Sequence, residues 1–199
     1  MTNSARPFGL KAITNNGVCK FGRYWAPASL ASLGINTPVD AGGTSNSANT
    51  TNGQLTSAGT MPSIVVATGG TTNKILGSIV GFEVLPTDLF KAGYNAANSA
   101  RIVYVADDIN QEFAIVDDGI GTLAITDVNL NANLTIGTVD AFTNIDSTSL
   151  NTTTPPASTA AFQLKILSLL DEPLNEVAAY ATWRVKINNH RLANAVVGV

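Results

Sequence analysis

Short apolar runs separated by polar turn residues dominate the pattern of this chain. Residues 102–105 and 113–116 are two such runs, rich in β-branched and aromatic side chains, and each ends just before an Asp-Asp pair. Side chains of these two kinds favour strands, whereas Asp, Asn and Gly favour tight turns. Residues 101–119 are therefore predicted to form two successive strands of a β-meander.

Similar runs recur along most of the sequence. In the run at 75–85, Gly77 and Gly81 interrupt the apolar residues, which indicates a bulge or a tight bend. In the run at 179–190, apolar and polar side chains alternate, which is typical of a half-buried strand. The other predicted strands lie within residues 21–28, 35–39, 64–67, 121–137 and 161–170.

This pattern predicts an all-β fold, a single β-barrel or sandwich domain of about 8–10 short strands with almost no helix. A chain of 199 residues suits one domain with appendages. We expect an extended N-terminal arm, a barrel domain, two long polar loops inside that domain, and an apolar tail that packs on a neighbour or folds back. These segments are residues 1–19, 20–190, 42–60 with 137–160, and 191–199, respectively.

Charge is sparse and unevenly distributed. Charged residues make up 13% of the chain, against about 25% in typical domains. A surface of neutral polar groups tolerates close packing against itself or a partner. Residues 1–39 carry four basic and no acidic residues, and the remainder carries seven basic and fourteen acidic residues, so the two parts have charges of +4 and −7. The basic arm either docks on an acidic surface or is simply solvated.

Candidate catalytic and metal-binding chemistry is scarce. Cys19 and His190 are the only cysteine and histidine, so one chain holds neither a disulfide nor a Cys/His zinc site. His190 is predicted to be a surface or interface side chain. The acidic residues at 107–118 could approach a hard cation, although solvated turns are the simpler interpretation. We expect no enzyme activity, no catalytic residue, no cofactor and no metal.

Two aromatic residues near the N-terminus allow two interpretations. Tyr24 and Trp25 follow Phe21 closely, and aromatic side chains fill cores and interfaces. They could instead form a platform for stacking sugars or bases, supported by a cation–π contact from Arg23. Core or interface packing is the favoured interpretation.

No apolar run approaches the ~20 residues of a membrane-spanning helix, and the N-terminus lacks a signal-peptide core. We therefore expect synthesis in a cytoplasm-like compartment and no membrane partner.

Seven motifs follow one another between Pro7 and His190. They are P-F-G-L, R-Y-W-A-P-A, I-L-G-S-I-V-G-F-E-V-L-P-T-D-L, A-N-S-A-R-I-V-Y-V-A-D-D-I-N-Q-E-F-A-I-V-D-D-G, T-D-V-N-L-N-A-N-L, A-F-Q-L-K-I-L-S-L and A-T-W-R-V-K-I-N-N-H. In this order they resemble a family of small structural proteins of tailed bacteriophages that are encoded beside the major capsid protein. The sequence departs from the family pattern in its loop at 42–60 and in Ile109, where the corresponding turn often carries proline.

The resemblance implies a capsid decoration (cement) protein: a β-barrel on the exterior of the virion that binds the major capsid protein and stabilises contacts between capsomers. We expect residues 1–28 to contact the shell, the barrel to form a homo-oligomer, most simply a trimer, and no direct contact with nucleic acid. The alternative is an adsorption or carbohydrate-binding module that uses Tyr24 and Trp25. The predicted capsid or subunit interface comprises Arg6, Phe8, Lys11, Lys20, Arg23, Tyr24 and Trp25.

Overall fold

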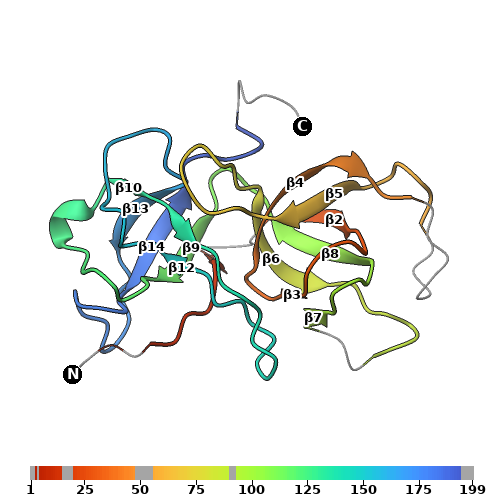
Figure 1. Cartoon of the computed structure of the whole chain (residues 1–199), viewed down its shortest axis with the longest axis horizontal. Coiled ribbons are helices and arrows are strands. Elements are labelled where there is room, and N and C mark those ends of the chain that lie inside the picture. Colours follow the sequence, from red (N-terminus) through yellow and green to blue (C-terminus); the bar gives the residue numbers. More distant parts are fainter. Residues whose placement is uncertain (1–2, 4, 15–19, 48–55, 90–92, 194–199) are drawn as a thin grey trace.

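The structure is a computed structural model, and it describes residues 3, 5–14, 20–47, 56–89 and 93–193. It consists of β-strands and loops arranged as two lobes, a closed barrel and an open sheet (Figure 1). Within the described residues the helical element is a single 3-10 turn, η2 (Ile125–Asp127), so the predicted all-β fold is confirmed. These residues contain no helix with the length and apolar character needed to cross a membrane.

The barrel lobe closes through five strands in the order β2, β5, β4, β6 and β8. Neighbouring strands are antiparallel except β2 and β5, which run parallel. A short ladder of β3 and β7 accompanies the barrel. The elements of this lobe are β2 (Gly22–Ala26), β3 (Leu33–Gly34), β4 (Pro38–Ser45), β5 (Pro62–Val66), β6 (Gly77–Phe82), β7 (Tyr94–Asn95) and β8 (Arg101–Ala106).

Side chains that alternate along these strands fill the barrel, because successive residues of a strand point to opposite faces. The predicted irregularity of the glycine-interrupted strand is confirmed, since β6 shifts register against β8 between Ile79 and Gly81. At Gly77 a Cβ atom would collide with the backbone oxygen of Ala106, so the close approach of β6 and β8 requires glycine there. The barrel core comprises Tyr24, Ala26, Leu33, Val39, Ile64, Leu76, Ile79, Phe82, Val103 and Val105.

The second lobe is an open antiparallel sheet with the strand order β1, β9, β14, β13, β10. A two-stranded ladder of β11 and β12 lies beside it. The elements of this lobe are β1 (Lys11–Ile13), β9 (Glu112–Val116), β10 (Asn131–Ala132), β11 (Leu134–Thr135), β12 (Ser149–Leu150), β13 (Leu164–Leu169) and β14 (Thr182–Ile187).

Strand β14 shows why this lobe forms. Trp183, Val185 and Ile187 are buried and alternate with half-buried polar residues, as the sequence pattern predicts. Their cluster extends beyond the sheet, because Ala106 of barrel strand β8 and Ile75, two residues before β6, belong to the same buried group. The core of the sheet is therefore continuous with the outside of the barrel.

Three expectations about chain organisation need correction. The two strands predicted at 101–119 exist, but β8 belongs to the barrel and β9 to the sheet, so they form no meander. The closed barrel occupies residues 22–106 instead of most of 20–190. The predicted arm at 1–19 is not a separate segment throughout, since its residues 11–13 form β1, which pairs with β9 as an edge strand of the sheet.

The polar loops also differ from expectation. Residues 42–45 continue strand β4, and residues 48–55 lie outside the described part of the chain. Residues 136–148, between β11 and β12, form a hydrogen-bonded hairpin that projects between the lobes at the lower edge of Figure 1. Of the tail, residues 191–193 are described and follow a parallel bridge between His190 and Ile75.

Candidate interaction surfaces

The N-terminal arm joins the two lobes. Its Leu10 is fully buried, and the Leu10 N–H donates to the backbone oxygen of Asn36 at 2.9 Å. The Asn36 amide donates in turn to the carbonyl oxygen of Phe8 at 2.8 Å. Gly9, with φ 74°, lies against the Asn36 backbone, where a side chain would not fit. The arm is thus fixed to the barrel before it enters the sheet as β1.

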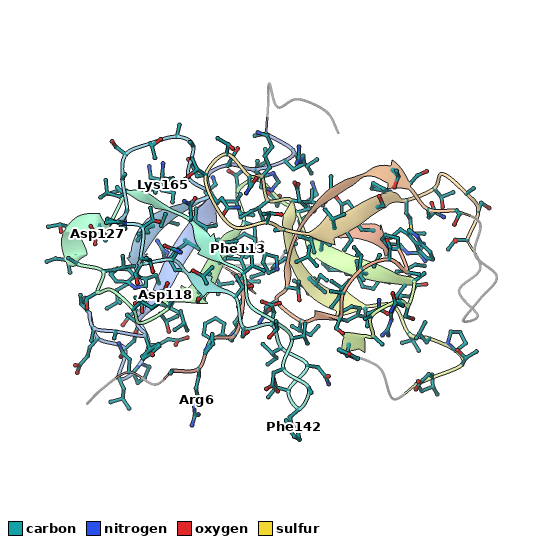
Figure 2. All side chains as sticks on the ribbon, viewed as in Figure 1. Arg6, Phe113, Asp118, Asp127, Phe142 and Lys165 are labelled. Carbon is teal, nitrogen blue, oxygen red and sulfur yellow. The ribbon has the colours of Figure 1, made fainter. Side chains whose placement is uncertain are left out.

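The basic side chains of the arm are presented to solvent. Arg6 is exposed and points away from the body at the lower edge of Figure 2. Lys11 is exposed, and its Nζ lies 5.8 Å from the centroid of the half-buried Phe8 ring, a cation–π contact. Lys20 is exposed at the start of the barrel segment. Arg6, Lys11 and Lys20 are thus exposed and Phe8 is half-buried, and the role of all four at an interface remains a prediction.

Arg23 has a partner within the chain. Its Nε and Nη2 donate to the two carboxylate oxygens of Glu83 at 2.9 and 2.8 Å, a forked ion pair on the outer barrel wall. The Tyr104 hydroxyl donates to the same carboxylate at 3.2 Å, and the Phe21 ring packs edge-on against Tyr104. Partial burial and the Glu83 charge raise the pKa of Tyr104. The charge of Arg23 is thus already balanced, which weakens its case as a docking residue.

Tyr24 and Trp25 are buried, with 8% and 5% of their surfaces exposed. The Tyr24 hydroxyl donates to Asp107 at 2.6 Å, and burial together with that carboxylate raises the pKa of Tyr24. Trp25 lies on the opposite face of β2, where Met61 and Ile102 cover it. The core interpretation is confirmed for both residues. Their assignment to the interface, and to a sugar-stacking platform, is wrong because neither ring is accessible.

Asp117 and Asp118, which follow β9, accept hydrogen bonds from residues of the neighbouring turns. Asp117 is buried and accepts hydrogen bonds from the backbone N–H groups of Gly119, Tyr180 and Ala181 and from the Trp183 indole. Burial raises its pKa, while these four donors oppose that rise.

Asp118 accepts from the Ile120 N–H and from the N–H and hydroxyl of Thr152. No group of three or more His, Cys, Asp or Glu side chains suited to a metal ion occurs in the part of the chain that the structure describes.

The hairpin at 136–148 presents a feature that the sequence analysis missed. Phe142 lies at its tip with 96% of its surface exposed, and Figure 2 shows the ring pointing away from the body. Asp140 accepts hydrogen bonds from the N–H groups of Phe142 and Thr143 at 2.9 and 2.7 Å and from the Thr143 hydroxyl. These bonds stabilise the carboxylate and lower the pKa of Asp140. The signal in the sequence is an Asp followed three residues later by Thr, a typical turn pattern.

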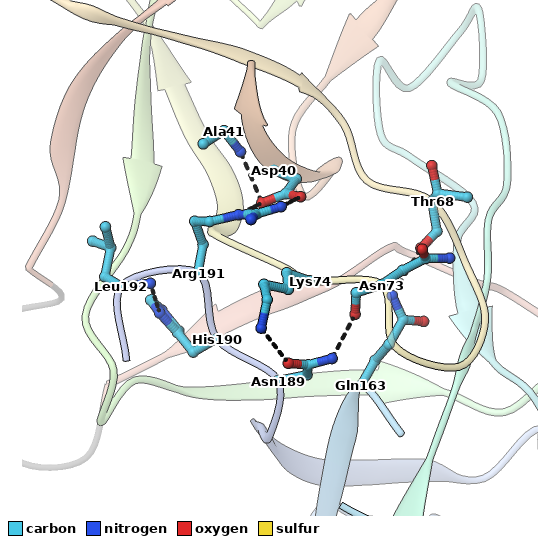
Figure 3. Close-up of polar contacts among 10 residues, drawn as sticks. All are labelled: Asp40, Ala41, Thr68, Asn73, Lys74, Gln163, Asn189, His190, Arg191 and Leu192. Atoms are coloured by element: carbon cyan, nitrogen blue, oxygen red, sulfur yellow. Dashed lines mark hydrogen bonds and ion pairs between the residues drawn. The ribbon is translucent and has the colours of Figure 1, made fainter. Parts of the chain in front are cut away.

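A second feature missed from the sequence is a cavity of about 270 Å3 where the barrel meets the chain after β14. Its lining includes Val65 and Val66 of β5 and the side chains of Asp40, Lys74 and Arg191. Arg191 makes a forked ion pair with Asp40, in which Nε donates to Oδ1 at 2.7 Å and Nη2 to Oδ2 (Figure 3). The Asp40 carboxylate raises the pKa of Arg191.

Lys74 occupies another side of this cavity. Its Nζ donates to Oδ1 of Asn189 at 3.1 Å, and the Asn189 amide donates to the Asn73 carbonyl oxygen at 3.1 Å (Figure 3). The described residues offer Lys74 no carboxylate within ion-pair distance. The cavity is open to solvent, and six of its eight lining residues are polar; Val65 and Val66 lie beside the guanidinium–carboxylate pair and the Lys74 ammonium group.

His190 is buried beside this cavity, with 2% of its surface exposed, so its predicted surface position is wrong. Its Nδ1 accepts a hydrogen bond from the Leu192 N–H at 3.0 Å, and its buried Nε2 has no hydrogen-bond partner among the described residues. Burial lowers the pKa of His190, because the charged imidazolium loses hydration there.

No protein-family model, curated protein or solved structure matches this chain. The functional argument therefore rests on the residues and geometry described above.

Proposed function

We propose that this chain is a structural virion protein that binds the outer surface of an icosahedral phage capsid and stabilises contacts between capsomers. The observation that carries the proposal is how the polar side chains of the described residues are used. Asp117 and Asp118 hold the loops around β9 and β14, and Arg101 is buried and donates to the carbonyl oxygens of Glu83 and Tyr94. These polar side chains hold long loops in place, as expected of a rigid structural protein.

Rigidity matters because a cement protein acts by resisting separation of its neighbours. A protein that is already ordered loses little conformational entropy when it binds. The lobes are connected at several places, among them the arm through Leu10, the segment between β8 and β9 through the Tyr24–Asp107 hydrogen bond, and the hairpin. In the hairpin, Asp146 donates its N–H to the Ile35 carbonyl oxygen at 3.0 Å, and its carboxylate accepts from the Thr37 hydroxyl. Many weak contacts repeated over a closed shell then add up to a strong restraint.

The arm supplies the proposed shell-facing contact. Arg6, Lys11 and Lys20 are exposed basic residues in the part of the sequence that lacks acids. Complementary charge accelerates association and fixes orientation more than it raises affinity. The partner that fits is an acidic surface of the major capsid protein, and the capsid exterior is the proposed location.

Binding to particles tests this proposal. The test uses purified chain and particles of the phage that encodes it, stripped of the chain. Deleting residues 1–19 would also remove edge strand β1, so reversing charge is the sharper change. We expect Arg6→Glu with Lys11→Glu to weaken binding roughly tenfold at low salt and to flatten its salt dependence.

Lys165→Glu is the control for a charge reversal outside the arm, because Lys165 of β13 lies in the upper half of the view in Figure 2 and Arg6 lies at its lower edge. It should bind like wild type. Equal binding by the arm variant and the control would overturn the shell-facing role of the arm, and no binding by the wild type would overturn the proposed function.

A further inference from the structure

Phe142 is unusual because the chain exposes its ring almost fully while fixing the backbone beneath it. Scattered exposed apolar residues are normal on protein surfaces. Phe142 differs in that the Asp140 carboxylate binds two successive N–H groups of the turn, and the Asn144 N–H donates to the Asp140 carbonyl oxygen at 2.9 Å. The ring is therefore presented on a preorganised support, which reduces the entropy lost on binding.

The end of the tip turn is also held against the barrel lobe. The Ile35 N–H donates to the Asn144 carbonyl oxygen at 3.0 Å, and Ile35 and Ile145 form a parallel bridge. The hairpin begins and ends in the ladder beside the open sheet and rests on the barrel. The hairpin that bears Phe142 is therefore attached to both lobes.

The chain also contains a cavity that suits a phenyl ring. Its volume of about 270 Å3 is large enough for a ring, although the pocket is open to solvent and six of its eight lining residues are polar. Val65, one of its two apolar lining residues, is 36% exposed. The Arg191 guanidinium, held flat by Asp40, offers a stacking face, and the Lys74 ammonium offers a cation–π partner.

We propose that copies of this chain associate by inserting Phe142 of one copy into the Val65–Lys74–Arg191 cavity of the next. The low charge of the chain, −3 over 199 residues, leaves little repulsion between copies. The hairpin projects at the lower edge of Figure 1, whereas the loop between β5 and β6 that walls the cavity lies at the upper edge. The contact is therefore head-to-tail, and it repeats into a ring or a chain of copies.

This inference specifies a contact for the homo-oligomer expected from the sequence, and it rests on the proposed function for its biological role. Its test uses purified protein alone. Failure of the contact would leave capsid binding standing, and failure of capsid binding would leave the contact standing.

The first experiment is sedimentation of wild type and Phe142→Ser over a concentration series up to about 1 mM. The wild type should form assemblies larger than a dimer, and the variant should associate roughly thirtyfold more weakly or not at all, as expected for loss of an aromatic anchor. The hydrogen bond at this position uses the backbone N–H of Phe142, so the thermal midpoint should not change. Phe21→Ser, at a phenylalanine 54% exposed on the barrel wall, is the matched control and should associate like wild type.

The second experiment distinguishes this contact from other modes of association. Val65→Lys blocks the cavity but keeps the ring, and Phe142→Ser keeps the cavity but lacks the ring. Each variant alone should be monomeric, and an equimolar mixture should form heterodimers through the one contact that remains. A monomeric wild type, unchanged association of Phe142→Ser, or a mixture without heterodimers would each overturn the proposal.

Discussion

The two lobes solve the problem of unpaired strand edges differently. The barrel closes on itself, so its five strands leave no open edge. The sheet stays open and ends in two short strands, β1 with three residues and β10 with two. Short edge strands limit pairing with other chains. The barrel is thus complete within residues 22–106. The sheet instead combines β1, which precedes the barrel in the sequence, with strands that follow the barrel.

This difference implies that the stability of the sheet depends on the barrel more than the stability of the barrel depends on the sheet. The sheet takes β1 from before the barrel, and its core includes Ala106 of β8 and Ile75, two residues before β6. In the described part of the chain, the five barrel strands close with one another and take no strand from the sheet. We therefore expect damage to the barrel to unfold both lobes and damage to the sheet to spare the barrel. The two tryptophans, Trp25 in the barrel and Trp183 in the sheet, make this testable.

The largest expected effect comes from Trp183→Ala. Trp183 is fully buried in the core of the sheet, and truncating such a side chain costs about 3–5 kcal/mol of unfolding free energy. The loss should appear in urea unfolding followed by circular dichroism. Fluorescence of the remaining Trp25 should keep a transition close to that of the wild-type barrel. A shared shift of both signals would mean that the lobes form one cooperative unit.

A smaller but broader effect is expected from Gly77→Ala. The added Cβ would collide with the backbone of β8, and overpacking of this kind costs about 1–3 kcal/mol or more when backbone must move. Both tryptophans should then report a lower urea midpoint. Gly81→Ala, in the same strand, is the control, because its Cβ would lie 3.7 Å from the nearest atom, in the Tyr104 ring. If both variants behave alike, the close approach at Gly77 does not limit the barrel.

The pH dependence of stability tests the junction between the lobes. Burial lowers the pKa of folded His190, although nearby Asp107, Asp108 and Asp40 favour its protonated form and Lys186 opposes it. As pH falls below the ordinary value of about 6.5, the unfolded chain binds the proton first. The stability contributed by neutral His190 is therefore present above that pH and is lost as pH falls through the folded pKa.

His190→Asn removes the titrating group and keeps an acceptor for the Leu192 N–H. Its thermal midpoint should fall less than that of wild type between pH 7 and pH 5. Identical pH profiles would exclude His190 as a source of this dependence.

The strands could be predicted from sequence where a local pattern carried the information. In β14 the alternation of Trp183, Val185 and Ile187 with polar residues marks a half-buried strand without reference to other parts of the chain. In β6 the glycines marked an irregularity. Strand partners could not be predicted in this way, because the turn residues at 107–110 indicate that the chain turns but not which sheet receives β9.

The candidate interaction surfaces were less accessible to prediction. Tyr24 and Trp25 are adjacent and so lie on opposite faces of β2, and Trp25 is buried because Met61 covers the outer face. That contact joins residues far apart in sequence. Phe142 sits in a segment whose composition indicates only a polar loop, and the cavity gathers residues between Asp40 and Arg191. Tertiary packing decides exposure at each of these positions.

The proposal that this chain is a capsid decoration protein is tested most directly by its copy number in purified particles of the phage that encodes it. Quantitative mass spectrometry against the major capsid protein measures this ratio. We predict one copy per capsid subunit or a simple fraction of it. A ratio of a few per cent would place the chain at a vertex or tail and contradict a role in cementing the shell.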